Sequence, residues 1–422
     1  MGFGILIHVK KIATLAITTK SKLLNLLIMK KITLIMIATI LFSAIKAQED
    51  YNVSQASGKF ALDIYKHFAQ ENSDNIFFSP FSLYIAMGMT YAGAEAETKS
   101  EIAQVFNFPL DDKNLHRHLG NLQKDIQSKK SKGIEIAIAN QLWADKLYKF
   151  NCSYIKGIKK AYNAPVKRME FRIKPNDCRL EINRWVEQQT NERIKDLLPD
   201  GSISDMTALV LTNAIYFKGQ WDEKFDPENN IKDIFFMEDG NETECLMMTA
   251  QKKFNIYHNR EFKMLEMPYK GKEFSMLVIL PEERIPLKSI EQSLSHENLN
   301  HCISLLMESD VRVSLPKFKF SAEFQLKPTL IKMGMPTPFS NGADFTRMSS
   351  KSDLKIDEVF HKAFVEVSEE GTEAAAATAV VIVRKSVTIP VDFVANRPFM
   401  FIIRENATGN ILFMGRVNNP NS

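Results

Sequence analysis

Hydrophobic and polar positions alternate along the chain at two spacings, one typical of helices and one typical of strands. Spacings of three and four residues predict a helix with an apolar stripe made of Phe60, Ala61, Ile64, Tyr65 and Phe68. Alternation at every second residue predicts strands over 134–143 and 310–324, and strand follows strand from 254, with hairpins over 262–281. Helices and strands therefore both contribute to the fold.

Further helices are expected over 86–94, 115–132 and 153–162. Thr98 and Glu101 have the spacing of a capping box at the start of another helix. No linker, repeat or low-complexity spacer divides the 422 residues, which favours one large domain.

The segment 367–399 carries two conflicting local preferences. Four consecutive alanines, beginning at Ala374, favour a helix, whereas Val-Val-Ile-Val at 380–383 favours a strand. Six alternate residues from Thr372 onward are small or apolar, so the segment can enter a sheet while Glu373 falls on the other face. Equally, it can lie outside as an exposed helix, loop or linker. A segment with two available states is a candidate conformational switch.

The motifs in and around this segment resemble the hinge, reactive loop and carboxy-terminal strands of serpins, a family of mostly protease-inhibiting proteins. EEGTEAAAAT, a basic site and ANRPFMFIIRENATGNILFMGRVNNP follow one another as they do in that family. INRWVEQQTNERIKDLLP, LVLTNAIYFKGQWDEKF and FSNGADF match other family motifs in the same order. The resemblance extends from about Gln55 to Pro420.

The resemblance implies an α+β serpin fold with three β-sheets, about nine helices and an exposed reactive loop over about 369–390. The implied hinge consists of Glu369, Glu370, Gly371, Thr372, Glu373, Ala374, Ala375, Ala376, Ala377 and Thr378. The implied shutter and breach regions, where the main sheet opens, contain Ser79, Ser82, Asn213, Trp221, Lys317 and His361. In this interpretation Lys317 pairs with Glu369. Ser79 and Ser82 also fit the start of a helix.

The resemblance further implies a protease inhibitor and not an enzyme, with no catalytic residue of its own. Lys385 is the seventeenth residue counted from Glu369, the position at which inhibitory serpins usually present the bond to be cut. We therefore predict Lys385-Ser386 as the reactive bond and Arg384-Lys385 as the second choice. A basic residue suits the anionic pocket of a trypsin-like serine protease, the expected covalent partner. A protease that prefers paired basic residues is a third possibility.

A non-inhibitory serpin, acting as a carrier or chaperone, is the main alternative. Relatives of that kind often depart from the family's hinge pattern with bulky or charged residues, and this hinge shows no such departure. Motifs of other enzyme classes, such as GxSxG, HExxH and the phosphate-binding loop, are absent. The cysteine and histidine spacings support no metal site, and no cofactor is expected. The four cysteines allow three full disulfide pairings, or they are free thiols: Cys152, Cys178, Cys245 and Cys302.

The first 47 residues contain seven lysines and no acidic residue. Met29-Lys30-Lys31 precedes an apolar run of about 14 residues, a pattern typical of a secretory signal. We therefore expect a leader over 1–47, with Met29 as its working start, and a single serpin domain over 48–422; an uncleaved membrane anchor is the alternative. Removing the leader changes the formal charge from +4 to −3, so the basic composition is no argument for nucleic-acid binding.

The expected product is a secreted, extracellular monomer without a membrane partner. Four sequons provide glycosylation candidates at Asn52, Asn151, Asn241 and Asn406. The helix expected over 115–132 carries His116, Arg117, His118, Lys124, Lys129, Lys130 and Lys132. In serpins that heparin activates, the corresponding helix binds the polyanion. A solvated helix face is the simpler explanation of this cluster.

Overall fold

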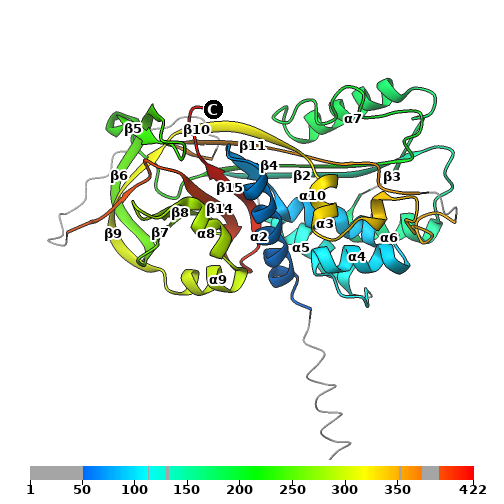
Figure 1. Cartoon of the computed structure of the whole chain (residues 1–422), viewed down its shortest axis with the longest axis horizontal. Coiled ribbons are helices and arrows are strands. Elements are labelled where there is room, and N and C mark those ends of the chain that lie inside the picture. The colour runs from blue at the N-terminus through cyan, green and yellow to red at the C-terminus, as the bar shows by residue number, and fades with distance from the viewer. Residues whose placement is uncertain (1–50, 113, 130–132, 165, 351–353, 373–388) are drawn as a thin grey trace, which may run out of the picture. The chain divides into compact units, whose positions relative to one another are not determined.

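Strands β2 (Ile134–Asp145) and β4 (Leu209–Gln220) are neighbours in a six-stranded sheet in the computed structural model of the chain (Figure 1). The structure describes residues 51–112, 114–129, 133–164, 166–350, 354–372 and 389–422. The two strands pair antiparallel from Ile134 opposite Gly219 to Ala144 opposite Leu209. The strand order is β10-β11-β12-β4-β2-β3. The other strands are β3 (Val166–Met169), β10 (Phe318–Gln325), β11 (Val359–Ser368) and β12 (Gly371–Thr372).

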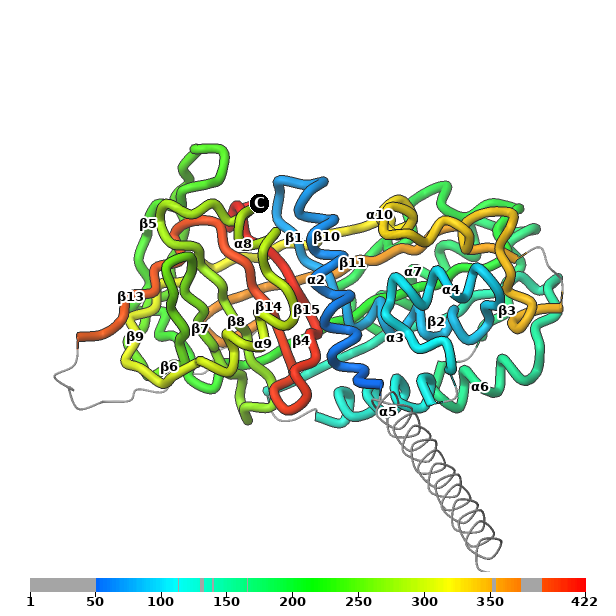
Figure 2. The backbone as a smooth tube through the Cα atoms, turned by 60° about the horizontal axis from the view of Figure 1, so that its bottom comes forward, coloured from blue at the N-terminus to red at the C-terminus, as the bar shows by residue number. Residues whose placement is uncertain are grey.

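Helices cover both faces of this sheet, which explains why β4 is apolar and buried along most of its length. Helix α7 (Pro175–Gln189) lies on one face, where Ile182 and Val186 join a buried cluster with Trp143. Helices α3 (Pro80–Tyr91) and α5 (Leu115–Ser128) lie on the other face (Figures 1 and 2).

The remaining strands join into a nine-stranded network with the order β1-β15-β14-β8-β7-β6-β9-β13, and β5 pairs with β6. Strand β6 (Glu242–His258) pairs with β5 and β9 along most of its length and with β7 at its end. These bonds join what would otherwise be two of the three expected sheets. The other strands are β1 (Ile76–Phe78), β5 (Ile231–Phe236), β7 (Phe262–Pro268), β8 (Phe274–Pro281), β9 (Met307–Pro316), β13 (Val391–Val394), β14 (Phe399–Glu405) and β15 (Ile411–Val417).

The described residues contain nine α-helices and two short 3₁₀ turns, so the predicted α+β class with about nine helices is confirmed. The expected apolar stripe lies on α2, and the helices expected over 115–132 and 153–162 are α5 and α6. The remaining helical elements are α2 (Val53–Glu71), α4 (Ala96–Phe106), α6 (Cys152–Tyr162), α8 (Leu287–Ser293), α9 (His296–Ser304), α10 (Lys327–Lys332), η1 (Pro227–Asn229) and η2 (Thr337–Phe339).

The predicted capping box at Thr98 and Glu101 is wrong. Both residues lie inside α4, whose N-cap is Glu95. The Thr98 hydroxyl accepts a hydrogen bond from the backbone N–H of Asp344, and the Glu101 carboxylate accepts two from Thr337. Their spacing therefore serves contacts with a distant segment and not the local helix end.

Residues Val53–Ser422 form one compact unit. Among the residues that the structure describes, no helix is long and apolar enough to cross a membrane. The predicted leader over 1–47 lies outside the described residues.

Candidate functional site

The first hinge residues already occupy a place in the six-stranded sheet. Gly371 and Thr372 form β12, which pairs antiparallel with β11 on one side and with β4 on the other. Thr372 lies opposite Val367 of β11 and Gly219 of β4. The last described residues of the hinge before position 373 therefore enter the sheet as a strand, and the alternation after Thr372 lies outside the described residues.

Gly371 is required by the close approach of the two backbones at this point. Its φ is +147°, a conformation that residues with a Cβ rarely adopt. A Cβ at this position would stand 2.0 Å from the carbonyl oxygen of Gly219. Any larger residue would push the hinge away from β4.

The Thr372 side chain is 2% exposed and its hydroxyl lies 2.6 Å from that of Tyr269. The Tyr269 ring stacks on Trp221 at a centroid separation of 4.7 Å. The Trp221 indole N–H donates to the carbonyl of Ser368, at the end of β11. An aromatic pair thus supports the point at which the hinge enters the sheet.

The two acidic residues before Gly371 fix the turn between β11 and β12 through polar contacts. Glu369 accepts hydrogen bonds from Lys317 at 3.0 Å and from Asn230. Burial opposes ionisation of Glu369, but hydrogen bonds from its backbone, Asn230 and Lys317 hold the pKa of this carboxyl below its usual range. Glu370 forms an ion pair with Lys224. The predicted pairing of Lys317 with Glu369 is present in the structure.

Below the hinge, β11 and β4 are parted. They pair directly, in parallel, only over 359–362 of β11 and 211–214 of β4. Between this paired section and β12, residues 363–366 of β11 and 215–218 of β4 are not paired with each other in the described structure. More of the hinge can therefore enter between these two stretches first, and entry beyond them requires the paired section to separate.

A polar cluster lies on that paired section, at the predicted shutter. His361 stands opposite Asn213 in the register, and its Nδ1 lies 2.8 Å from the Asn213 side-chain oxygen. Its Nε2 accepts a hydrogen bond from the backbone N–H of Ser79, which fixes a neutral ring with the proton on Nδ1. Complete burial lowers the pKa of His361 to about 3.

The two predicted shutter serines complete this cluster. Ser79 caps α3 by accepting from the N–H of Ser82, and its hydroxyl donates to the carbonyl of Leu412. Asn213 donates to the Ser82 hydroxyl and to the side-chain oxygen of Asn140, each at 2.6 Å. Capping and sheet contacts are therefore made by the same two serines.

Sequence reasoning missed three members of these clusters. Asn140 is a buried amide within the apolar strand β2, and this contrast was a usable signal. Tyr269 and Asn230 lie outside regular alternating runs, and only the tertiary register brings them to the hinge. No local pattern identifies them.

The predicted reactive-bond residues Arg384, Lys385 and Ser386, and the hinge residues over 373–378, lie outside the described residues. The chain resumes at Ile389, and β13 follows, pairing in parallel with β9. The described chain thus stops at Thr372 in the six-stranded sheet and resumes at Ile389, just before a strand of the nine-stranded network.

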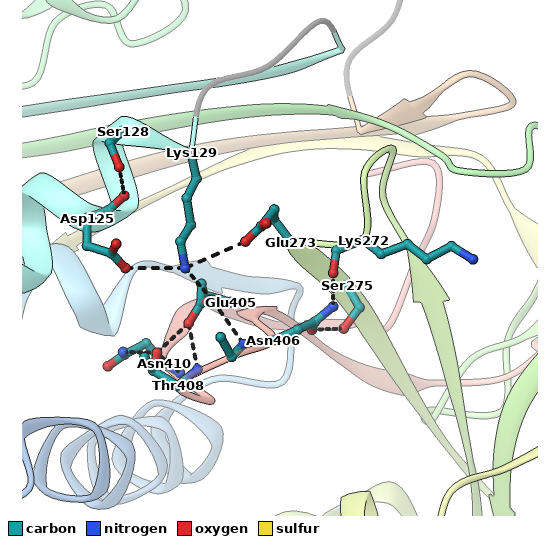
Figure 3. A network of polar contacts seen from close by, with 11 residues as sticks. Asp125, Ser128, Lys129, Lys272, Glu273, Ser275, Glu405, Asn406, Thr408 and Asn410 are labelled. Carbon is teal, nitrogen blue, oxygen red and sulfur yellow. Dashed lines mark hydrogen bonds and ion pairs between the residues drawn. The ribbon is translucent and has the colours of Figure 1, made fainter.

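The four predicted glycosylation sites differ in their surroundings. Asn52 and Asn241 are exposed, and the Asn241 amide donates to the nearby carboxylate of Asp239. The Asn151 amide donates twice, to the carbonyls of Thr346 and Arg347. The Asn406 amide donates to the carbonyl of Lys272 and accepts from Ser275 (Figure 3). The four cysteines are unpaired, so none of the three possible disulfide pairings is present.

Helix α5 presents fewer free cations than its sequence suggests. His116 points toward Tyr162, with Nδ1 2.7 Å from the hydroxyl, and burial lowers the pKa of the imidazole to about 4. Lys129 is surrounded by the carboxylates of Asp125, Glu273 and Glu405 (Figure 3). Lys130 and Lys132 lie outside the described residues, whereas the remaining basic residues with exposed side chains are Arg117 and Lys124.

No group of three or more His, Cys, Asp or Glu side chains in the described part of the chain is arranged to hold a metal ion. The site consists instead of the two-residue strand β12 between β11 and β4, the polar contacts of Glu369 and Glu370 beside it, and the polar cluster around His361 and Asn213.

Comparison with known proteins identifies the class to which this arrangement belongs. The family model of serpins, the serine protease inhibitors, matches residues 55–420. Human Serpin B4 is 41% identical over 87% of this chain and 100% of its own length. Mouse Antithrombin-III is 39% identical over 88% of this chain and 82% of its own length.

Solved structures agree. Human thyroxine-binding globulin in complex with thyroxine has a TM-score of 0.80 and 30% identity, covering 88% of this chain and 99% of that one. Uncleaved ovalbumin has a TM-score of 0.79 and 29% identity, covering 87% and 100%. The chain belongs to the serpin family, whose protease-inhibiting members act on proteases and are not enzymes themselves.

Proposed function

We propose that this serpin is a secreted suicide-substrate inhibitor of a trypsin-like serine protease. Lys385-Ser386 is the bond offered for cleavage, with Arg384-Lys385 as the second choice. The observation that carries the proposal is the position of Gly371 and Thr372 as a strand between β11 and β4. The hinge is thus already aligned with the space that the rest of the loop must fill.

The proposed reaction begins as ordinary proteolysis. The serine hydroxyl of the protease attacks the carbonyl carbon of Lys385, the bond to Ser386 breaks, and the new amine of Ser386 receives the proton through the protease histidine. The resulting acyl-enzyme joins Lys385 to the protease. The freed loop then inserts between β11 and β4 and carries the protease along the sheet, a strand addition known for serpins.

Inhibition requires that insertion be faster than hydrolysis of the acyl bond. Thr372 already lies in the sheet, and the alternate residues that follow it as far as 382 are small or apolar. No charge must therefore be buried at the beginning of insertion. This composition supports inhibition over the alternative of a non-inhibitory carrier or chaperone.

Trypsin-like and elastase-like proteases can be compared directly as targets. One relative, at 39% identity, is named leukocyte elastase inhibitor, in Xenopus tropicalis, and an elastase pocket accepts small residues. The basic pair Arg384-Lys385 supports a trypsin-like target instead. Parallel reactions with trypsin and elastase separate the two.

The decisive experiment mixes the protein with trypsin below equimolar amounts, followed by denaturing electrophoresis and mass spectrometry of the released peptide. We expect a band at the summed mass and a peptide that begins at Ser386. A peptide beginning at Lys385 would move the bond to Arg384. Complete cleavage without a covalent band, with both proteases, would contradict the proposal.

Secretion and glycosylation belong to the same proposal, since serpins include extracellular and intracellular members. The leader over 1–47 supports secretion, and sequencing the amino terminus of protein from the culture medium tests it; we expect Gln48 first. Polyanion binding on α5 is less well supported, because His116 and Lys129 are engaged within the fold. Elution from a heparin column in graded salt measures it.

A further inference from the structure

A segment of the chain far from the hinge is strongly basic. Residues 146–174 contain nine basic residues and one acidic residue, Glu170. Glu170 pairs with Lys146 and lies 3.9 Å from Lys174. The exposed basic side chains without a hydrogen-bond or ion-pair partner among the described residues are Lys149, Lys156, Lys159, Lys160 and Arg172. Three of them lie on one exposed face of α6, at 156, 159 and 160.

The basic segment leads into one edge of the six-stranded sheet, where three loops meet. β2 ends at Asp145, β3 ends at Met169 and β4 begins at Leu209. Asp145 is buried and joins the loops: its N–H donates to the carbonyl of Ala208, and its carboxylate accepts from the N–H groups of Leu147 and Arg172. We call the loops 146–149, 170–174 and 204–208 the three-loop tip.

Each loop of the tip exposes one large apolar side chain. Met206 is 82% exposed, Ile173 73% and Leu147 59%. They rank among the most exposed large apolar residues of the described chain. Their loops follow or precede the neighbouring strands β3, β2 and β4, and neighbouring strands of a sheet lie about 5 Å apart. Single exposed apolar residues are ordinary on protein surfaces, but three gathered at one edge beside unpaired cations are not.

We propose that the three-loop tip and the lysine face of α6 dock the protein on an anionic lipid bilayer. Apolar side chains that project beside basic residues enter the headgroup region, while the cations are attracted by the lipid phosphates and carboxylates. A linear sulfated polysaccharide would be bound by the lysines alone and gives no role to Leu147, Ile173 and Met206. Asp205, the acidic residue of the third loop, weakens the attraction without reversing its sign.

Docking by this edge would leave the reactive loop accessible. Ile134 lies beside Gly219 and the hinge, whereas Ala144 lies beside the tip, so the two sites are about 33 Å apart along β2. The next step rests on the proposed function. Loop insertion carries the protease toward the tip, so formation of the covalent complex and bilayer docking should exclude each other.

The test is sedimentation of the full mature chain with vesicles of phosphatidylcholine alone or containing 30% phosphatidylserine. We expect binding to the anionic vesicles only. The variant Leu147→Ser/Ile173→Ser/Met206→Ser should bind at least tenfold more weakly, whereas Met307→Ser, another exposed apolar residue, should bind as the unmodified chain does. Lys156→Gln/Lys159→Gln/Lys160→Gln should weaken binding by about fivefold per lysine.

A matched charge control is Arg260→Gln/Arg284→Gln/Lys288→Gln, which removes three exposed cations elsewhere and should change binding less than twofold. Circular dichroism checks that every variant is folded. Absence of binding to anionic vesicles, or equal loss in the control, would overturn the proposal. So would retention on heparin that depends on the α6 lysines without vesicle binding. None of these results depends on inhibitory activity, so failure here is distinguishable from failure of the proposed function.

Discussion

Replacing Thr372 by arginine tests the insertion mechanism at its first step. The Thr372 side chain is 2% exposed, with its hydroxyl 2.6 Å from that of Tyr269 and its backbone between β11 and β4. A guanidinium group there has no free acidic partner in the described surroundings. Glu369 is bonded to Lys317, and Glu370 is paired with Lys224.

The magnitude follows from burying an unpaired charge, which costs about 3–5 kcal/mol. If the resting hinge of the variant leaves the sheet and meets this cost in the transition state of insertion, the insertion rate falls about 150- to 4000-fold, because each 1.4 kcal/mol is a factor of ten. Hydrolysis of the acyl-enzyme, which does not involve the sheet, keeps its rate. The variant should therefore be cleaved at the reactive bond and release active protease.

The assay is titration of protease activity, together with the fraction of serpin in the covalent band. Thr372→Val is the matched control, because it keeps the shape, adds no charge and loses only the hydrogen bond to Tyr269. We expect Thr372→Val to form the complex and Thr372→Arg to act as a substrate. Normal complex formation by Thr372→Arg would refute the reasoning that the place of Thr372 between β11 and β4 must stay free of charge for insertion to proceed.

Three further predictions concern the buried His361, the ion pair of Lys317 with Glu369 and the glycans. The pKa of His361 is depressed to about 3, so the stability of its neutral form is present above the unfolded pKa of about 6.5 and is lost as the pH falls. Between pH 7.5 and 5 the unmodified chain should lose about 2 kcal/mol more unfolding free energy than His361→Gln in urea titrations; equal losses would exclude this group. Lys317→Met should lower the unfolding free energy by at most about 1 kcal/mol, because Lys317 is 37% exposed in its pair with Glu369 and the Glu369 carboxyl retains its hydrogen bond from Asn230. A loss of several kcal/mol would contradict this small contribution of the ion pair. In secreted protein, isotope labelling during deglycosylation should find Asn241 occupied more fully than Asn151, whose amide hydrogens are both engaged, and the reverse order would show that the folded contacts do not govern occupancy.

The sequence predicts those parts of the site that depend on local pattern. Gly371 and Thr372 lie in a strand, the alternation after Thr372 stays a prediction, and the motif around Asn213 lies where β4 is paired with β11. Pairing of Lys317 with Glu369 follows from family resemblance and is present.

Contacts that depend on tertiary register were beyond the sequence. His116 and Lys129 count as surface cations by composition, but the packing of α5 turns one toward Tyr162 and the other toward Glu405. Thr98 and Glu101 have a capping-box spacing, but distant segments compete for their oxygens. The same polar groups fit local and long-range partners, and only the fold decides between them.

The aromatic support beneath the hinge gives the chain an optical reporter. Of its three tryptophans, Trp143 and Trp185 pack against each other away from the hinge, with ring centroids 5.3 Å apart. Trp221 stacks on Tyr269. A chain with phenylalanine at 143 and 185 would emit from Trp221 alone. Its fluorescence would then follow each change at the entry to the sheet in real time, without an attached dye.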